Sequence, residues 1–251
     1  MIGRLQRRAR LLALRFRPEF RRSIEDPNVP LSLDMDHDSR TLLIAFGGMR
    51  GQLGMPPFEF FKATGSIPVK RLFVRDLRQA WYHRGIPGHG STVESVSESL
   101  GELIAGHGVE HLVVVGNSAG GYAALLFGTL LGADTVLCFA PQTVIELDAL
   151  AEMGDHRWDG QLEELIADGD LDPRWTDLRR ALPGARRADT RYELYFDGSF
   201  TTDRLHAERL AELEGVVLHR SEGGAHAIAR EMRESGELQP VLQHALEPHA
   251  G

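Results

Sequence analysis

The stretch LVVVGNSAGGYAALLFG, residues 112–128, decides the fold. It begins as a run of apolar residues with β propensity, stops at a serine set among glycines, and continues as a segment rich in alanine and leucine. This order predicts a buried strand that passes through a tight turn into an apolar helix. Ser118 lies in the turn, with Gly116 two residues before it and Gly120 two residues after it.

The same alternation of strand and helix continues on both sides of this stretch. We expect strands over residues 31–36, 41–48, 71–76, 111–117, 135–141, 191–197 and 215–220. We expect helices from residue 91, over 119–131, over 203–214 and after 227; Ser91 and Glu94 have the spacing of a capping box. The pattern predicts an α/β fold with a mostly parallel central sheet and helices on both faces.

The chain has 251 residues, of which 42% are hydrophobic, and this is enough for one domain with a sizeable core. We assign residues 31–251 to that domain. Residues 143–177 differ in composition, because eleven acidic residues there face only Arg157 and Arg174 among the basic ones. We therefore predict a small helical cap insertion over residues 143–185.

Residues 1–30 form a basic N-terminal arm, with eight arginines against Glu19 alone in residues 1–22. Apolar residues recur there at helical spacing, so the arm has the pattern of an amphipathic helix that lies on anionic lipid, nucleic acid or an acidic partner. We favour a helix packed on the protein's own acidic surface, and hence no nucleic-acid partner. The apolar run LLAL ends at Arg15, too short for a signal peptide or a membrane span.

The net charge is −8. The chain has a single cysteine, Cys138, which lies in an apolar run, so no disulfide framework is possible. These features predict a soluble, cytoplasmic protein with a buried thiol.

The sequence GNSAG matches the G-x-S-x-G pattern, in which a serine at a sharp strand-to-helix turn is presented as a nucleophile. The glycines leave room for the neighbouring backbone at such a turn. The alternative is a tight turn of a nucleotide-binding fold. That alternative favours G-x-G-x-x-G or G-x-x-x-x-G-K-[ST], and GNSAGG supplies neither.

A serine nucleophile needs a base and an acid. His226 follows the last predicted strand behind a pair of glycines, in SEGGAHAIAREM, and suits the base. Asp197, at the end of the strand YELYFD, is our preferred acid. Asp203 is its rival, although a position near the start of a helix also accounts for Asp203.

Acyl transfer also needs donors for a developing oxyanion. The strand end AFGGM offers the backbone N–H groups of Gly48 or Met49 beside that of Ala119, at the start of the helix. Spacings typical of metal sites, such as H-E-x-x-H or paired cysteines, do not occur, so we predict no metal and no organic cofactor.

The serine turn, the strand-end aspartate and GGAH, in that order, resemble the α/β-hydrolase superfamily from about Thr41 onward. The segments GYAALLFG, FAPQT and DRLHAERL are loosely similar to small hydrolase-like proteins of bacterial polysaccharide or natural-product pathways. Two features depart from the superfamily. The turn after the acid reads FDGSF rather than G-x-x-D, and the loop FGGMRGQLG is not of the HGGG form.

The resemblance implies a serine hydrolase, a carboxylesterase or thioesterase, that cleaves a small acyl substrate with Ser118, His226 and Asp197. An acyltransferase or cyclase that uses the same residues is the first alternative, and a non-catalytic binding protein of the same fold is the second. For the aromatic residues Trp81, Tyr82, Trp158 and Trp175 we weigh pocket walls against core packing, and favour the core.

Overall fold

The computed structural model describes residues 18–49, 59–186, 189–223 and 225–248. Seven strands form one sheet in the order β1-β3-β2-β4-β5-β6-β7. Their bounds are β1 Leu31–Asp34, β2 Thr41–Phe46, β3 Lys70–Val74, β4 His111–Asn117, β5 Thr135–Phe139, β6 Arg191–Asp197 and β7 Val216–Ser221. Only β1 runs antiparallel to its neighbour; the other pairs are parallel.

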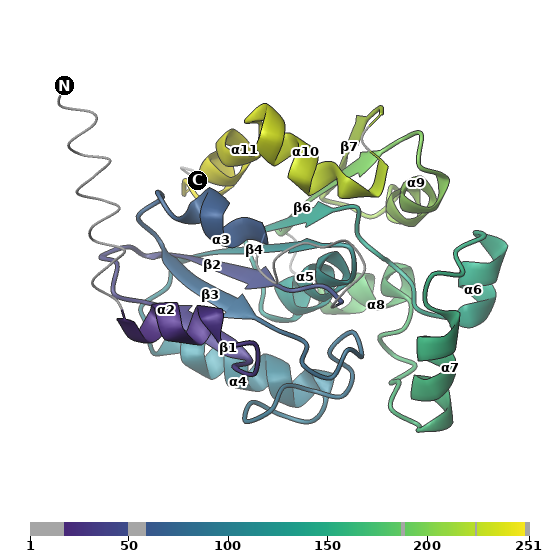
Figure 1. Cartoon of the computed structure of the whole chain (residues 1–251), viewed down its shortest axis with the longest axis horizontal. Coiled ribbons are helices and arrows are strands. Elements are labelled where there is room, and N and C mark those ends of the chain that lie inside the picture. The colour runs from purple at the N-terminus through teal and green to yellow at the C-terminus, as the bar shows by residue number, and fades with distance from the viewer. Residues whose placement is uncertain (1–17, 50–58, 187–188, 224, 249–251) are drawn as a thin grey trace.

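Helices lie on both faces of the sheet (Figure 1). They are α2 Pro18–Glu25, α3 Glu59–Thr64, α4 Val93–Ala105, α5 Ala119–Leu130, α6 Leu147–Glu152, α7 Asp159–Ala167, α8 Leu178–Ala185, α9 Thr201–Glu208, α10 Ile228–Ser235 and α11 Leu238–Ala245. A 3₁₀ turn, η2, covers Ala225–Ala227. Figure 1 shows α10 and α11 above the sheet and α4 below it.

The alternation of side chains along each buried strand supplies both cores. Leu42 and Ile44 of β2 join the apolar cluster that contains α4 and α5, whereas Leu43 and Ala45 join the cluster that contains α3, α10 and α11. Strand β4 is buried along its whole length between β2 and β5. A strand buried on both faces explains why residues 111–117 are apolar almost without interruption.

The N-cap of α4 lies one residue later than the sequence pattern indicates. Its N-cap is Thr92, whose side chain accepts a hydrogen bond from the backbone of Ser95, while the Ser95 hydroxyl accepts from the backbone of Thr92. The capping box is thus Thr92 with Ser95, and the prediction of Ser91 with Glu94 was wrong. The Glu94 carboxylate instead accepts a hydrogen bond from the Trp175 indole.

Residues 143–185 lie between β5 and β6 and contain α6, α7 and α8, which we call the helical segment. Figure 1 shows α6 and α7 beyond one end of the sheet. An isolated bridge joins Val144 to Asp177 near the base of the segment. Residues 1–17 of the predicted N-terminal arm lie outside the described residues. Of the rest, α2 packs on the sheet, with Phe20 buried.

Parallel strands end at one edge of the sheet, and this edge positions the site. Strands β2, β4, β5 and β6 end at Phe46, Asn117, Phe139 and Asp197. The residues that follow them are therefore close together in space although they are far apart in the sequence.

Candidate active site

Ser118 lies between β4 and α5 with φ 54° and ψ −119°, a backbone conformation that L residues rarely adopt. The surrounding backbone holds it in place: its N–H donates to the Phe139 carbonyl, and its own carbonyl accepts from Tyr122 and Gln142. Strain of this kind persists where several contacts fix it, and it is common at functional sites.

The glycines around Ser118 are required by close backbone contacts. A Cβ at Gly116 would lie 1.9 Å from the Gly120 carbonyl oxygen, and a Cβ at Gly120 would lie 2.4 Å from the Phe46 carbonyl oxygen. A Cβ at Gly121 would lie 2.8 Å from the Pro141 side chain. The chain thus uses glycine here to bring β2, β4 and α5 together at a sharp turn.

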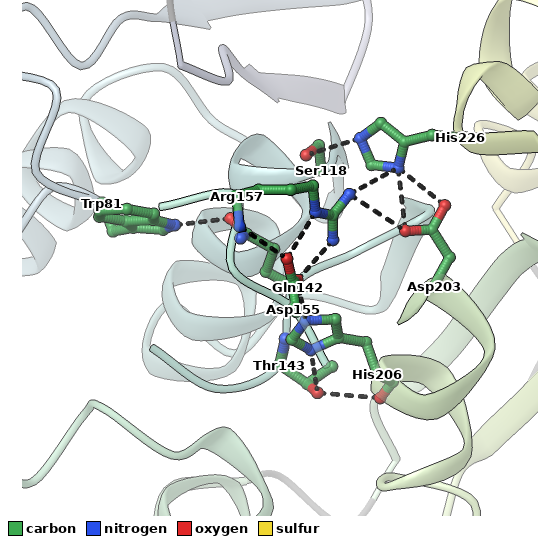
Figure 2. A network of polar contacts seen from close by, with 9 residues as sticks. All are labelled: Trp81, Ser118, Gln142, Thr143, Asp155, Arg157, Asp203, His206 and His226. Atoms are coloured by element: carbon green, nitrogen blue, oxygen red, sulfur yellow. Dashed lines mark hydrogen bonds and ion pairs between the residues drawn. The ribbon is translucent and has the colours of Figure 1, made fainter. Parts of the chain in front are cut away.

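His226 lies in η2, just before α10, and its imidazole faces Ser118 (Figure 2). The distance between His226 Nε2 and Ser118 Oγ is 3.1 Å. The structure therefore brings together the two residues that the sequence paired. The Phe200 ring lies beside the imidazole, with the two ring centroids 5.9 Å apart.

The carboxylate next to His226 is that of Asp203, on α9. Its two oxygens lie 2.9 Å and 2.7 Å from His226 Nδ1, and the side chain is 1% exposed. An ionised carboxylate only accepts hydrogen bonds, so the proton of a neutral imidazole is on Nδ1. The lone pair of Nε2 is then free to accept the Ser118 hydroxyl proton.

Asp197, the preferred acid from the sequence, is not the carboxylate at His226. Its Oδ1 accepts hydrogen bonds from the backbone N–H and the hydroxyl of Ser199, both at 2.7 Å, and its carbonyl accepts from Phe200. Asp197 thus stabilises the turn after β6, and this turn carries the chain to Asp203 in the first turn of α9. The structure corrects the assignment in favour of the rival residue.

Gly48 and Met49 follow β2 and lie at the same edge of the sheet. Gly48 is close to the serine turn, because a Cβ built on it would lie 3.3 Å from the Asn117 carbonyl oxygen and 3.6 Å from the Gly120 nitrogen. Ala119 is the first residue of α5, where a backbone N–H has no acceptor within its own helix. The oxyanion role of Gly48, Met49 and Ala119 stays a prediction.

Arg157 was not among the predicted site residues, but it reaches the site from the helical segment (Figure 2). Its NH1 lies 3.3 Å from His226 Nδ1 and 3.5 Å from Asp203 Oδ1. On the other side, its Nε and NH2 donate to the two carboxylate oxygens of Asp155 at 2.7 Å and 2.6 Å. One signal was available: Arg157 is one of only two basic residues among the eleven acidic ones of residues 143–177.

Asp155 is also held by His206, which lies one helical turn after Asp203 on α9. His206 Nδ1 accepts from the backbone N–H of Thr143 at 3.1 Å, so its proton is on Nε2, 3.2 Å from Asp155 Oδ2. Burial lowers the pKa of His206, although Asp155 opposes this effect. Burial alone would raise the pKa of Asp155, but hydrogen bonds from Arg157 and His206 outweigh it and hold that pKa well below its usual range.

Trp81, Tyr82 and Trp158 are buried, as expected for core residues. The Trp81 and Trp158 rings pack edge to face with their centroids 5.6 Å apart, and the Trp81 indole donates to Gln142. Trp175 is partly buried and donates to Glu94.

A cavity of about 780 Å³ lies elsewhere on the described part of the chain, and none of Ser118, His226 and Asp203 lines it. It is bordered by the N-terminus of α4 and by the chain around His83 and Asp172. Arg84, on its wall, pairs with Asp168 and Asp170. This cavity is therefore separate from the polar contacts that join Ser118, His226 and Asp203.

Within residues 18–49, 59–186, 189–223 and 225–248, no three His, Cys, Asp or Glu side chains are grouped so that they could hold a metal ion. Over the same ranges no helix is long and apolar enough to cross a membrane.

No known family profile and no curated protein matches the sequence. Solved structures resemble the chain over most of its length. The capsule O-acetyltransferase of Neisseria meningitidis serogroup A has a TM-score of 0.60 at 13% identity, over 85% of this chain and 90% of that one.

Two hydrolases are similar in the same way. An α/β-hydrolase from the metagenome of lagoon sediments of Mar Chica, Morocco, has a TM-score of 0.53 at 17% identity, over 85% of this chain and 93% of that one. The S-formylglutathione hydrolase of Staphylococcus aureus has a TM-score of 0.57 at 12% identity, over 83% and 84%. The mostly parallel seven-stranded sheet and these neighbours confirm the predicted α/β-hydrolase fold.

Proposed function

We infer that this chain is a serine hydrolase that cleaves an ester or thioester. It has the α/β-hydrolase fold, and a serine, a histidine and an aspartate are in contact at the edge of its sheet. The observation that carries the proposal is the continuous contact from Ser118 Oγ through His226 to Asp203. A fold alone does not determine a reaction, whereas this arrangement of groups has a specific chemistry.

In the proposed reaction, Ser118 Oγ attacks the acyl carbon while its proton passes to His226 Nε2. The carbonyl electron pair moves to the oxygen and gives a tetrahedral oxyanion. Asp203 holds the imidazole in orientation and stabilises the cation that forms. The backbone N–H groups of Ala119 and of Gly48 or Met49 are the proposed donors to the oxyanion.

The intermediate then collapses, the bond to the leaving group breaks, and the alcohol or thiol departs with the proton from His226 Nε2. Water attacks the acyl-enzyme in the same way: His226 takes its proton, the acid is released, and the proton returns to Ser118. The cycle needs no metal and no organic cofactor.

We also propose that the helical segment, residues 143–185, is a cap on this site, since it delivers Arg157 to the triad. The substrate is then a small acyl compound that enters between the segment and the carboxyl edge of the sheet. The single cysteine, Cys138, is buried and is compatible with a reducing compartment such as the cytoplasm.

Acyl transfer is the second candidate function. One observation supports it as a candidate: a capsule O-acetyltransferase is among the solved structures with the same fold. The first half of the reaction is identical, and an alcohol or amine replaces water in the second half.

The test is hydrolysis of p-nitrophenyl acetate and of an acyl thioester by the wild type, Ser118→Ala and His226→Gln. We expect both variants to lose at least about 10³-fold in kcat/KM. Acylated product in the presence of alcohols or sugars would favour transfer. Equal rates for the wild type and Ser118→Ala would leave only the second alternative, a non-catalytic binding protein of the same fold.

A further inference from the structure

Arg157 contacts two residues of the proposed triad. Its NH1 lies within 3.5 Å of both Asp203 Oδ1 and His226 Nδ1. The guanidinium therefore shares the carboxylate with the imidazole. The guanidinium also lies over the Phe200 ring, 5.9 Å from its centroid, and this ring borders His226 as well.

Asp155 fixes the direction of Arg157. Two nitrogens of the guanidinium donate to two oxygens of one carboxylate, and this geometry sets the plane as well as the position of the cation. The Asp155 side chain is fully buried, whereas that of Arg157 is 24% exposed. A buried carboxylate needs a charged partner, so the fork holds both groups together.

His206 connects Asp155 to the helix that carries Asp203. Residues three apart on a helix share a face, so Asp203 and His206 point the same way from α9. The contacts form a closed circuit: from α9 through Asp203 to Arg157, then to Asp155, and back through His206 to α9. Thr143 fixes His206 from the other side through its backbone N–H and its hydroxyl.

We propose that Arg157 is a positioning residue of the triad: it fixes the Asp203 carboxylate against His226, and thereby couples the helical segment to catalysis. This inference rests on the proposed function.

The charges around the site give the direction of the effect. The charged and titratable groups that face one another are Arg157, Asp203, Asp155, His206 and His226. Two carboxylates and one guanidinium give these side chains a net charge of −1 apart from the imidazoles, and removal of the guanidinium makes it −2. Because the surroundings of the serine and its base become more negative, we expect the pH–rate profile of an Arg157 variant without the charge to move to higher pH.

A purely structural ion pair would behave differently. Removal of Arg157 would then lower the free energy of unfolding but would leave the rate per folded molecule and its pH dependence unchanged. The pH dependence of the serine's reactivity is therefore the decisive readout.

The experiment measures the second-order rate of labelling by a fluorophosphonate probe from pH 5 to pH 9, for wild type, Arg157→Gln, Arg157→Lys and Arg174→Gln. Arg174 is the matched control, because it lies in the same segment and pairs with Glu94 and Asp172, which are not residues of the proposed triad. Thermal unfolding by circular dichroism gives the folded fraction of each variant.

We expect Arg157→Gln to label between about 10- and 100-fold more slowly. Its acidic limb should move to higher pH by about one unit. Arg157→Lys keeps the charge without the fork, so it should lose rate while its acidic limb stays close to that of the wild type. Arg174→Gln should match the wild type in both respects.

A wild-type rate and profile for folded Arg157→Gln would overturn the inference while the proposed function stands. No labelling of wild-type Ser118 would instead refute the proposed function. If Arg157→Gln does not fold, Arg157→Lys carries the test through its labelling rate. A wild-type labelling rate for folded Arg157→Lys would refute the positioning role, because that variant keeps the charge but loses the fork to Asp155.

Discussion

Asp203→Asn is the substitution that separates the acid preferred from the sequence, Asp197, from its rival, Asp203. Asp203 accepts from His226 Nδ1 with both oxygens, at 2.7 Å and 2.9 Å. Asparagine has one amide N–H₂ in place of one oxygen. The amide donates to Nδ1, the imidazole proton then moves to Nε2, and Nε2 no longer accepts the Ser118 proton.

The magnitude follows from the same geometry. Opposite unit charges about 3 Å apart interact by about 5 to 6 kcal/mol at an effective dielectric constant of about 20, and about 1.4 kcal/mol corresponds to a factor of ten in rate. The neighbouring Arg157 offsets part of this gain. We therefore expect kcat/KM to fall by about 10³- to 10⁴-fold, in the range known for the loss of a triad acid.

Asp197→Asn is the matched control, since it makes the same chemical change at a buried carboxylate six residues earlier. Asp197 accepts from Ser199 in the turn after β6, so its loss should lower the free energy of unfolding by about 1 to 3 kcal/mol. Its kcat/KM per folded molecule should stay within about twofold of the wild type.

The assay is p-nitrophenyl acetate hydrolysis, corrected for the folded fraction from urea unfolding. The reasoning is refuted if Asp197→Asn loses about 10³-fold while Asp203→Asn retains most of its activity. Equal and small losses in both variants would also contradict it, because the carboxylate contact at His226 would then contribute nothing.

Three further predictions concern the fold. Gly116→Ala places a Cβ 1.9 Å from a carbonyl oxygen and should cost about 3 kcal/mol in urea unfolding, whereas Gly160→Ala, with open space around it, should be neutral or slightly stabilising; similar losses would contradict the contact argument. Burial lowers the pKa of His83 to about 4 from 6.5, so the native state disfavours its protonation. The contribution of the neutral His83 to the free energy of unfolding is present above pH 6.5 and is lost as the pH falls to 4, about 3 kcal/mol in total. His83→Gln should flatten this part of the curve of unfolding free energy against pH, and an unchanged curve would exclude His83 as the source. Burial raises the pKa of the Cys138 thiol, so iodoacetamide at pH 8 should label the protein only after denaturation, and rapid labelling of the native state would disprove this.

The fold could be predicted because its central strands are buried on both faces, and their sequences are therefore continuous apolar stretches. Strand β6 has the predicted bounds, residues 191–197, and β4 has the predicted bounds, residues 111–117. Helix boundaries were harder. Residues 91–95 contain two overlapping capping-box patterns, and the structure uses the one formed by Thr92 and Ser95.

Within the site, the pairing of Ser118 with His226 followed from one motif and from chain order. The acid did not: the strand-end position favoured Asp197, and a position near the start of a helix accounted for Asp203 without catalysis. The geometry of the turn decides between them. Asp197 accepts a hydrogen bond from Ser199, whereas α9 places Asp203 next to the imidazole of His226.

Arg157 lay beyond sequence reasoning for a different reason. Asp155 is only two residues away, but Asp203 and His226 come from two other parts of the chain, and only the fold brings them to Arg157. The composition of residues 143–177 signalled a distinct segment, but composition alone does not reveal which of its charges face the triad.

The central claim is that Ser118 is a nucleophile activated by His226. Peptide mapping by mass spectrometry after fluorophosphonate treatment of the native protein tests it most directly. The account predicts one adduct, on Ser118, that is absent after heat denaturation and strongly diminished in His226→Gln. An unmodified native protein, or an adduct on another residue that persists in Ser118→Ala, would contradict it.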